Sequence, residues 1–438
     1  MPTSTSPGTE PSDDLRGEWA ILFTLAAVQF TSIVDFMIVM PLGPQLIESL
    51  GLDTARFGWI VSSYTFAAGI AGLCGVAVLD RIDRRTAFLV QYAGFVVGTF
   101  LCGLADSFGG LLAARIVTGA FGGVLGGQSL AIVGDLFPEE RRGHATGTLM
   151  SAFAVASVAG VPAGIWIGHA WGWQAPFLLL AAASLPLFAL AAWAIPPLTG
   201  HLGHAGEPAA RRLVGTLTRP DHLRAFALVS VLMIGAFAVI PFISASYVAN
   251  VGVSEAELPL VFVAGGLLTL VGSPVIGRLA DRIGKLAVFR FMVPLSAVMM
   301  LVITHLPRVG VGWAAAATAL LMLANTGRMV AAMALINGTV EPARRGGFMS
   351  ANSSIQHMAC GVGTAVGGAI VRGAPGEPLM HYDQAGWFAA AVTLASLWFA
   401  SRLRSPGGGP PTTPARSLAA AAEAEAAAGE AMAALDAE

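Results

Sequence analysis

Two residues of opposite charge lie inside apolar stretches, where a charge is costly. Asp35 stands nine residues before the end of an apolar segment at 18–44, and Arg115 stands five residues inside another at 110–134. A charged side chain at the centre of a bilayer costs ~2.5–3.5 kcal/mol on insertion scales, so such residues are paired, neutralised or in contact with water. Because the two depths are comparable, we predict an Asp35–Arg115 pair that keeps Asp35 ionised.

Such a pair has two possible uses. Protonation of Asp35 would release Arg115 and change the polarity around it, which would couple a proton to a change of conformation. Alternatively, the pair only holds two helices together. We expect the coupling role. His357 is a second proton-coupling candidate because an imidazole titrates near neutral pH, although a single histidine in an apolar helix is more often a hydrogen-bonded packing residue.

Arg328 lies near the middle of the apolar segment 312–339, and the second half of the chain has no acidic residue at a similar depth. An unpaired cation facing a central cavity would favour a substrate with an acidic or hydrogen-bond-accepting group. The alternative is that the guanidinium binds helix carbonyl groups. Polar residues in neighbouring segments are further candidates for lining such a cavity: Gln29, Tyr64, Gln128, Asn325, Asn352 and Gln356.

The composition is that of a membrane protein. The chain has 438 residues, of which 24 are basic and 26 acidic, so 11 % are charged. Soluble domains carry about 25 % charged residues. With 55 % hydrophobic residues and a mean hydropathy of +0.72, the chain does not fit a large soluble enzyme. A net charge of −2 offers no basic face for nucleic acid, so the expected partner is the lipid bilayer.

Twelve apolar segments are long enough for membrane-spanning helices, which need about 20 residues. We predict an all-α membrane protein with six-helix bundles at 18–195 and 224–401, joined by a cytoplasmic linker at 196–223. Cytoplasmic tails at 1–17 and 402–438 flank the bundles, the second of low complexity. The segments span 18–44, 56–79, 86–105, 110–134, 146–168, 175–195, 224–248, 258–279, 286–306, 312–339, 347–371 and 384–401.

Basic residues set the expected orientation. If the N-terminus is cytoplasmic, 19 Lys and Arg residues fall in cytoplasmic segments, and only Arg56, Arg308 and Arg372 fall in outer loops. Cytoplasmic loops of membrane proteins are enriched in Lys and Arg. We therefore expect both termini in the cytoplasm and the chain in the inner (plasma) membrane of a bacterium.

The two halves repeat each other in sequence. Three motifs recur in the same order and in equivalent loops or segments: residues 80–84 as 281–285, 141–143 as 344–346, and 150–152 as 349–351. The first of these has an offset of 201 residues, and the others differ from it by two. Parallel repeats of six helices are typical of transporters with a substrate site between the halves.

Residues 277–285 (GRLADRIGK) resemble the signature loop of the major facilitator superfamily, Gly-x-Leu-Ala-Asp-Arg-x-Gly-Arg/Lys. The loop after the second segment is a weaker match, with Val76 and Asp83 in place of the two glycines; Asp is tolerable there because it can adopt left-handed backbone. The resemblance covers 18–401. It implies a twelve-helix transporter of the drug:proton antiporter and sugar efflux group, with bundles related by a pseudo-two-fold repeat.

The resemblance also implies a gating role for the two loops. Their charged residues would bind a neighbouring helix end or acid when the cytoplasmic mouth closes, and release it when the halves rock apart. Asp135 is the expected partner of Arg81 or Arg85. The alternative is that these are ordinary turn and positive-inside residues. The gating candidates are Asp80, Arg81, Arg84, Arg85, Asp135, Gly277, Asp281, Arg282, Gly284 and Lys285.

Two further motifs resemble those of antiporters in the same superfamily. Residues 160–164 (GVPAG) resemble, in shortened form, the fifth-helix motif of proton-coupled exporters, and Arg115-x-x-x-Gly119 resembles a fourth-helix motif. Small residues at every fourth position pack helices in any membrane bundle. A packing role for Gly160, Pro162 and Gly164 is therefore expected with or without export.

No pattern for catalysis, metal binding or ATP use is recognisable in the sequence. We expect no enzyme activity, no metal and no cofactor, with a proton gradient as the energy source. The expected function is proton-coupled export of a small organic molecule, a drug or a metabolite, by a monomer, since one chain holds a complete site. One alternative is a proton-coupled importer of an organic acid or other anionic metabolite, which Arg328 favours. The other is a receptor or scaffold that transports nothing.

Overall fold

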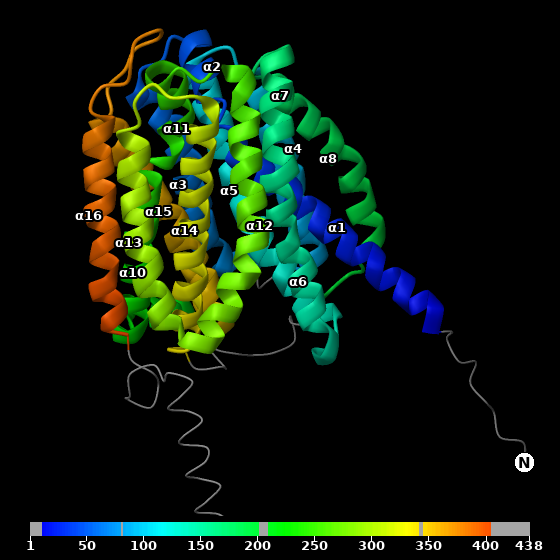
Figure 1. The fold of residues 1–438 in the computed structure, drawn as a ribbon. Coiled ribbons are helices and arrows are strands. Elements are labelled where there is room, and N and C mark those ends of the chain that lie inside the picture. Colours follow the sequence, from blue (N-terminus) through cyan, green and yellow to red (C-terminus); the bar gives the residue numbers. More distant parts are fainter. Residues whose placement is uncertain (1–10, 80–81, 201–208, 341–344, 404–438) are drawn as a thin grey trace, which may run out of the picture.

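A bundle of long helices forms the molecule in a computed structural model, which describes residues 11–79, 82–200, 209–340 and 345–403 (Figure 1). The first half contains α1 (Pro11–Ile38), α2 (Gly43–Ser49), α3 (Thr54–Leu79), α4 (Arg84–Leu104), α5 (Phe108–Leu136), α6 (Glu139–Val155), α7 (Val161–Trp171) and α8 (Ala175–Ala194). The second half contains α10 (Pro220–Phe237), α11 (Ile243–Ser246), α12 (Leu258–Ile283), α13 (Lys285–Thr304), α14 (Val311–Asn337), α15 (Arg345–Ile370) and α16 (Tyr382–Ser401).

The predicted fold class is confirmed. Within the described residues, ten helical segments are long and apolar enough to cross a membrane, with α6 and α7 counted as one segment and residues 220–251 as another. The more polar α15 and the helix α16, of 26 and 20 residues, complete the twelve. The predicted linker contains the short helix α9 (Ala209–Thr218). Residues 404–438 of the predicted tail lie outside the described residues.

The apolar core that the two halves share lies at one end of the bundle. We call the end at which α1 begins and α16 ends the proximal end, and the opposite end the distal end. At the distal end, one apolar core combines Phe57 and Trp173 of the first half with Phe242 and Val371 of the second. At the proximal end, each half has a core of its own. The structure is therefore closed between the halves at the distal side.

Small residues allow the helices of different halves to approach each other. A methyl group on Gly69 of α3 would lie 2.5 Å from Met358 Cγ of α15, and one on Gly266 of α12 would lie 3.0 Å from the backbone of Ser157. Close packing through small residues is a general means of helix association in membranes. The interface between the halves is thus formed by α3 against α15 and by the α6–α7 segment against α12.

Candidate functional site

The structure brings Asp35 and Arg115 together inside the first half. Arg115 Nη1 lies 2.8 Å from Asp35 Oδ2 and 3.3 Å from the Asp35 carbonyl oxygen, and Thr99 donates its hydroxyl to Oδ1 at 3.0 Å. The exposed fractions of the two charged side chains are 0 % and 1 %. Helices α1, α4 and α5 each contribute one residue, so the pair is enclosed by protein. Thr99 was not among the sequence-predicted residues, because a hydroxyl in an apolar helix carries little signal.

The ring of Tyr64 on α3 packs against the guanidinium of this pair. The Arg115 guanidinium carbon lies 4.4 Å from the centre of the Tyr64 ring, a cation–π contact. Gly119 makes this approach possible, because a methyl group there would lie 2.3 Å from the Tyr64 carbonyl oxygen. The Arg115-x-x-x-Gly119 spacing therefore places a cation and a close helix contact on one face of α5. Tyr64 is buried against α5 in this conformation, and its predicted role in lining a cavity stays a prediction.

The two first-half glutamines lie on α1 and α5, the helices that also carry Asp35 and Arg115. The Gln29 amide lies against α5 where Gly126 leaves room for it, 3.2 Å from the position that a Gly126 Cβ would occupy. Gln128 is buried, with 8 % of its surface exposed. Whether either residue contacts a substrate stays a prediction.

Residues of α15 reach the first half. The His357 ring lies edge-on to the Phe36 ring of α1, with the ring centres 6.3 Å apart. Gln356 is half-buried beside it. Asn352 is fully buried, and its amide nitrogen lies 3.9 Å from Met333 Sδ within the second half. Of these three, His357 therefore contacts the other half directly.

Arg328 does not face the space between the halves in this conformation. Its Nη1 donates to Thr393 Oγ1 of α16 at 3.1 Å, and its Nη2 donates to the carbonyl oxygen of Leu232 of α10 at 3.2 Å. The side chain is 2 % exposed. Asn325 accepts a hydrogen bond from Ser296 of α13. The geometry matches the alternative in which a helix carbonyl binds the guanidinium, because both partners belong to the second half.

Asp135 binds an arginine that was not among its expected partners, Arg81 and Arg85. Arg84 Nε donates to Asp135 Oδ2, whereas Arg85 donates to the carbonyl oxygen of Ala192 near the end of α8. Arg81 and Asp80 lie outside the described residues. The Arg84–Asp135 pair lies entirely within the first half and is present while each half has an apolar core of its own at the proximal end. It therefore does not depend on closure between the halves.

Asp83 connects two segments of the first half. Its carboxylate accepts hydrogen bonds from the backbone N–H groups of Thr86, at the start of α4, and of Leu198, beyond α8. Its φ of −50° rules out the left-handed conformation that would explain its substitution for glycine; the residue acts as a helix N-cap instead. Burial alone would raise the pKa of the Asp83 carboxyl, but these hydrogen bonds hold it below its usual 3.8.

Replacing Asp83 with alanine should lower the free energy of unfolding by ~0.5–2 kcal/mol at pH 7, the usual loss for a helix N-cap. Because the pKa is lower in the folded state, the contribution is complete above the unfolded value of 3.8 and is lost as pH falls through the folded value. Unfolding titrations of both proteins in detergent would therefore converge at low pH. A difference that persists below about pH 2 would contradict this account.

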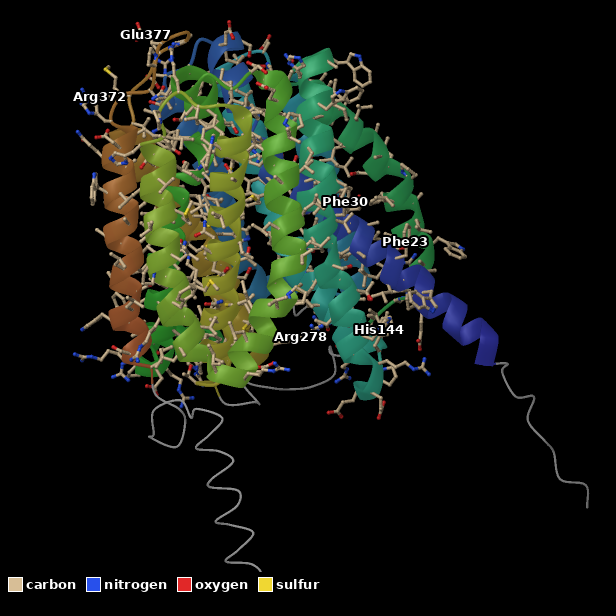
Figure 2. The ribbon with its side chains drawn as sticks, in the orientation of Figure 1. Phe23, Phe30, His144, Arg278, Arg372 and Glu377 are labelled. Carbon is tan, nitrogen blue, oxygen red and sulfur yellow. The ribbon has the colours of Figure 1, made fainter. Side chains whose placement is uncertain are left out.

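The second loop is exposed at the proximal end. Gly284 has a φ of +98°, a conformation that favours glycine, and it separates α12 from α13. Among the described residues, Asp281, Arg282 and Lys285 form no ion pair, and Gly277 has no close neighbour at its Cβ position. Figure 2 shows Arg278 of this loop and His144 of α6 at the same end, on different halves. The gating role of the loop stays a prediction.

The fifth-helix motif packs against α1. Methyl groups on Gly160, Gly164 and Gly168 would lie 2.4–2.5 Å from side-chain atoms of Val34, Ile38 and Leu42, respectively. Pro162 has no N–H, and the π-helical turn Ala156–Gly160 immediately precedes α7, so the regular hydrogen bonding is shifted there. Gly266 of α12 contacts this same turn from the other half. The motif thus lies where α1, α7 and α12 meet.

Polar contacts close the distal end. Gln45 of α2 donates to Glu255 Oε2 at 3.0 Å, and His169 Nδ1 of α7 lies 3.9 Å from the same oxygen. Nearby, Thr54 donates its hydroxyl to the carbonyl oxygen of Val371 at 2.6 Å. Each contact joins the first half to the second. No cluster of His, Cys, Asp and Glu in the described residues could hold a metal ion.

Comparison with known proteins identifies related transporters. The family model described as Major Facilitator Superfamily matches residues 25–220 and 225–429. The uncharacterized MFS-type transporter YceJ of Bacillus subtilis is 23 % identical over 85 % of this chain and 93 % of its own length. The inner membrane transport protein YdhP of Escherichia coli (strain K12) is 26 % identical over 76 % of this chain and 84 % of its own length.

Two further similar proteins are a drug resistance protein and a transporter of known crystal structure. A chloramphenicol resistance protein of Streptomyces lividans is 30 % identical over 57 % of this chain and 63 % of its own length. The crystal structure of a bacterial homologue of the human lysosomal transporter Spinster, in an inward-facing and unoccupied conformation, matches with a TM-score of 0.66 and 15 % identity. The match covers 90 % of this chain and 95 % of the other.

Proposed function

Since this chain belongs to the Major Facilitator Superfamily, we propose that it exports a small organic molecule in exchange for protons. The family consists of membrane transporters, not enzymes, and the chain is an integral, multi-pass membrane protein. Alternating exposure of a site between two six-helix halves is the mechanism that such repeats support. The proposal adds the direction of transport, the coupling ion and the residues that couple it.

The observation that carries the coupling is the enclosed Asp35–Arg115 pair. The Asp35 carboxylate accepts hydrogen bonds from Arg115 and Thr99 and has no exposed surface. Removing one charge from a buried pair leaves the other uncompensated, which costs several kcal/mol. A proton on Asp35 would therefore change the energy of the surrounding structure far more than a proton on an exposed carboxylate. Such an energy difference between protonation states can shift a conformational equilibrium.

The direction of transport is supported by two observations. One relative is a chloramphenicol resistance protein, and removal of a toxic compound from the cell is a form of export. The excess of Lys and Arg at one end supports a cytoplasmic proximal end, and the bacterial relatives support an inner-membrane location. With the distal side closed between the halves, this conformation is then the one that receives substrate from the cytoplasm.

The importer hypothesis was based on an unpaired Arg328 that faces a central cavity, and the structure does not show this arrangement. Arg328 donates to Thr393 and to the Leu232 carbonyl group within the second half, so its guanidinium is already engaged in this conformation. We therefore favour export. Asp35 is the principal proton-coupling residue in this proposal, with Arg115 as its partner and His357 as a second candidate.

The test compares cells that overexpress the chain with cells that lack it, using a panel of metabolites and antibiotics that includes chloramphenicol. Extracellular accumulation on overexpression is expected, and faster uptake would overturn the direction. The substrate found is then followed in liposomes under an imposed pH gradient. Asp35→Asn should abolish uphill transport, whereas Asp53→Asn, at an exposed position, should not. Uphill transport by Asp35→Asn would overturn the coupling.

A further inference from the structure

Phe36 follows Asp35 in α1, and its ring contacts aromatic rings from both halves. The ring centres lie 5.3 Å from Tyr64 of α3, 6.1 Å from Phe237 of α10 and 6.3 Å from His357 of α15. Tyr64 is the residue on which the Arg115 guanidinium rests. A continuous series of contacts therefore leads from the buried pair, through Tyr64 and Phe36, to two helices of the second half.

Phe36 and Phe237 occupy equivalent positions in the sequence repeat, and their rings contact each other. The two residues are 201 apart, the offset of the motif at 80–84 and 281–285, so they are equivalent in the register of that motif. In a two-fold arrangement, a residue that contacts its own equivalent lies on the symmetry axis. The stacked rings of Phe36 and Phe237, inclined by 28°, thus mark the pseudo-two-fold axis. The Phe36–Phe237 stack is therefore a contact between equivalent helices of the two halves at the centre of their interface.

The two halves differ in what lies beside the axis. Asp35 precedes Phe36, whereas Ala236 precedes Phe237. The same offset places Gly265 where the first half has Tyr64, and residues 314–318 around the equivalent of Arg115 contain no charge. The fold repeats, but the charge pair and its aromatic support occur once. A change in the protonation of Asp35 can therefore affect the Phe36–Phe237 contact only from the first half.

We propose that Phe36 is the positioning residue that links the state of the Asp35–Arg115 pair to the relative position of the two halves. This inference rests on the proposed proton coupling and names the residue that transmits it. While Asp35 is ionised, it holds Arg115 on the Tyr64 ring, and Tyr64 holds Phe36 against Phe237. Protonation of Asp35 removes the negative charge that attracts Arg115. The contact of Arg115 with Tyr64, and through it the position of Phe36, is then no longer fixed.

Other ionisable groups surround this series and must be separated from Asp35 in any test. Among the described residues they are Arg115 on α5, Tyr64 on α3, Cys102 on α4 and His357 on α15. A free imidazole titrates near neutral pH, so the contribution of His357 must be measured directly. A His357→Gln variant therefore shows whether a pH response arises from Asp35 or from the histidine.

The experiment measures the distance between the halves at the proximal end. Spin labels on His144→Cys and Arg278→Cys report this distance by pulsed electron spin resonance, and Figure 2 shows both positions at that end. Both side chains are exposed. Cys74 is replaced by serine because it is exposed, whereas Cys102 and Cys360 are buried. Distance distributions are recorded in nanodiscs at about pH 5.5 and pH 8, which bracket the ordinary imidazole range.

The labelled chain should shift its distance distribution between the two pH values. Phe36→Ala should lose this shift, and Phe36→Tyr, which keeps the ring, should retain it. His357→Gln should also retain it. The matched control is Phe95→Ala, which removes another buried ring, one that stacks on Tyr92 inside the first half, and should keep the shift.

The outcomes separate this inference from the proposed function. A labelled chain without any pH shift would overturn the proton coupling and the inference together. A shift that Asp35→Asn/Arg115→Gln abolishes but Phe36→Ala preserves would overturn the role of Phe36 and leave the coupling intact. A shift that His357→Gln alone abolishes would overturn both roles of the Asp35 site. Loss of the shift in Phe95→Ala as well would also overturn the inference, because any core defect would then be sufficient.

Discussion

Asp35→Asn should lower the free energy of unfolding by ~3–5 kcal/mol, the cost of leaving a buried charge without its partner. Arg115 is 1 % exposed, and a guanidinium does not lose its proton in proteins, so it stays charged when Asp35 is neutral. Arg115→Gln should cost less, because the remaining carboxyl can take up a proton. The loss of unfolding free energy in Arg115→Gln, relative to the original chain, should also become smaller as pH falls, because protonation of Asp35 becomes easier. Unfolding by SDS in mixed micelles measures these differences.

The double variant Asp35→Asn/Arg115→Gln tests whether the two losses have one cause. It carries no charge at positions 35 and 115. Its loss of stability should therefore be smaller than the sum of the two single losses by ~2–3 kcal/mol, in the range found for coupled neighbours. Because it should remain folded, it is also the variant in which loss of transport can be attributed to coupling. Arg84→Gln is the control: its pair with Asp135 is partly exposed, at 23 % and 35 %, and should contribute no more than about 1 kcal/mol.

Additive losses in the double variant would contradict the pairing, because residues that do not interact have independent effects. A fully stable Asp35→Asn would contradict it as well. The combination of a stable double variant with unimpaired uphill transport would leave the pair with a purely structural role. That last result would support the alternative in which the pair only holds α1 and α5 together.

The sequence predicts the twelve helices well because an apolar stretch of membrane-spanning length is a strong signal. It places their ends less well. α1 begins at Pro11, α6 at Glu139 and α10 at Pro220, in each case before the apolar stretch. These first turns are polar, so hydropathy does not distinguish them from loops. The π-helical turn at Ala156–Gly160 is also not evident, although Pro162 indicates that the helix must be irregular nearby.

Depth within a segment is enough to pair Asp35 with Arg115, because few charges share that level. Depth does not tell which way a side chain points, and Arg328 shows the consequence: it lies among α10, α14 and α16. The partner of Asp135 is similarly undetermined, since the direction of each arginine depends on where α4 begins. Phe36 is missed because one more phenylalanine in an apolar helix is ordinary. Its equivalence to Phe237 in the repeat is the signal that would have found it.

Gly119→Ala should lower the free energy of unfolding by ~1–3 kcal/mol, the usual cost of overpacking a tight contact. The new methyl group would lie 2.3 Å from the Tyr64 carbonyl oxygen and 2.8 Å from its Cα. These are backbone atoms, which cannot turn aside as the end of a flexible side chain can. Helix α5 must therefore move away from α3, and Arg115, one turn before Gly119, moves with it. Transport should fall together with stability.

Gly127→Ala, in the same helix, gives the opposite expectation. A methyl group there has no neighbour within 4 Å, so the substitution introduces no clash. Alanine is favoured over glycine inside a helix by ~0.8–1 kcal/mol, and this variant should be as stable as the original chain or more so. The two variants make the same chemical change two turns apart. Equal stability of both would show that the contact between α5 and α3 is looser than 2.3 Å implies, and that Gly119 does not set the position of Arg115 above Tyr64.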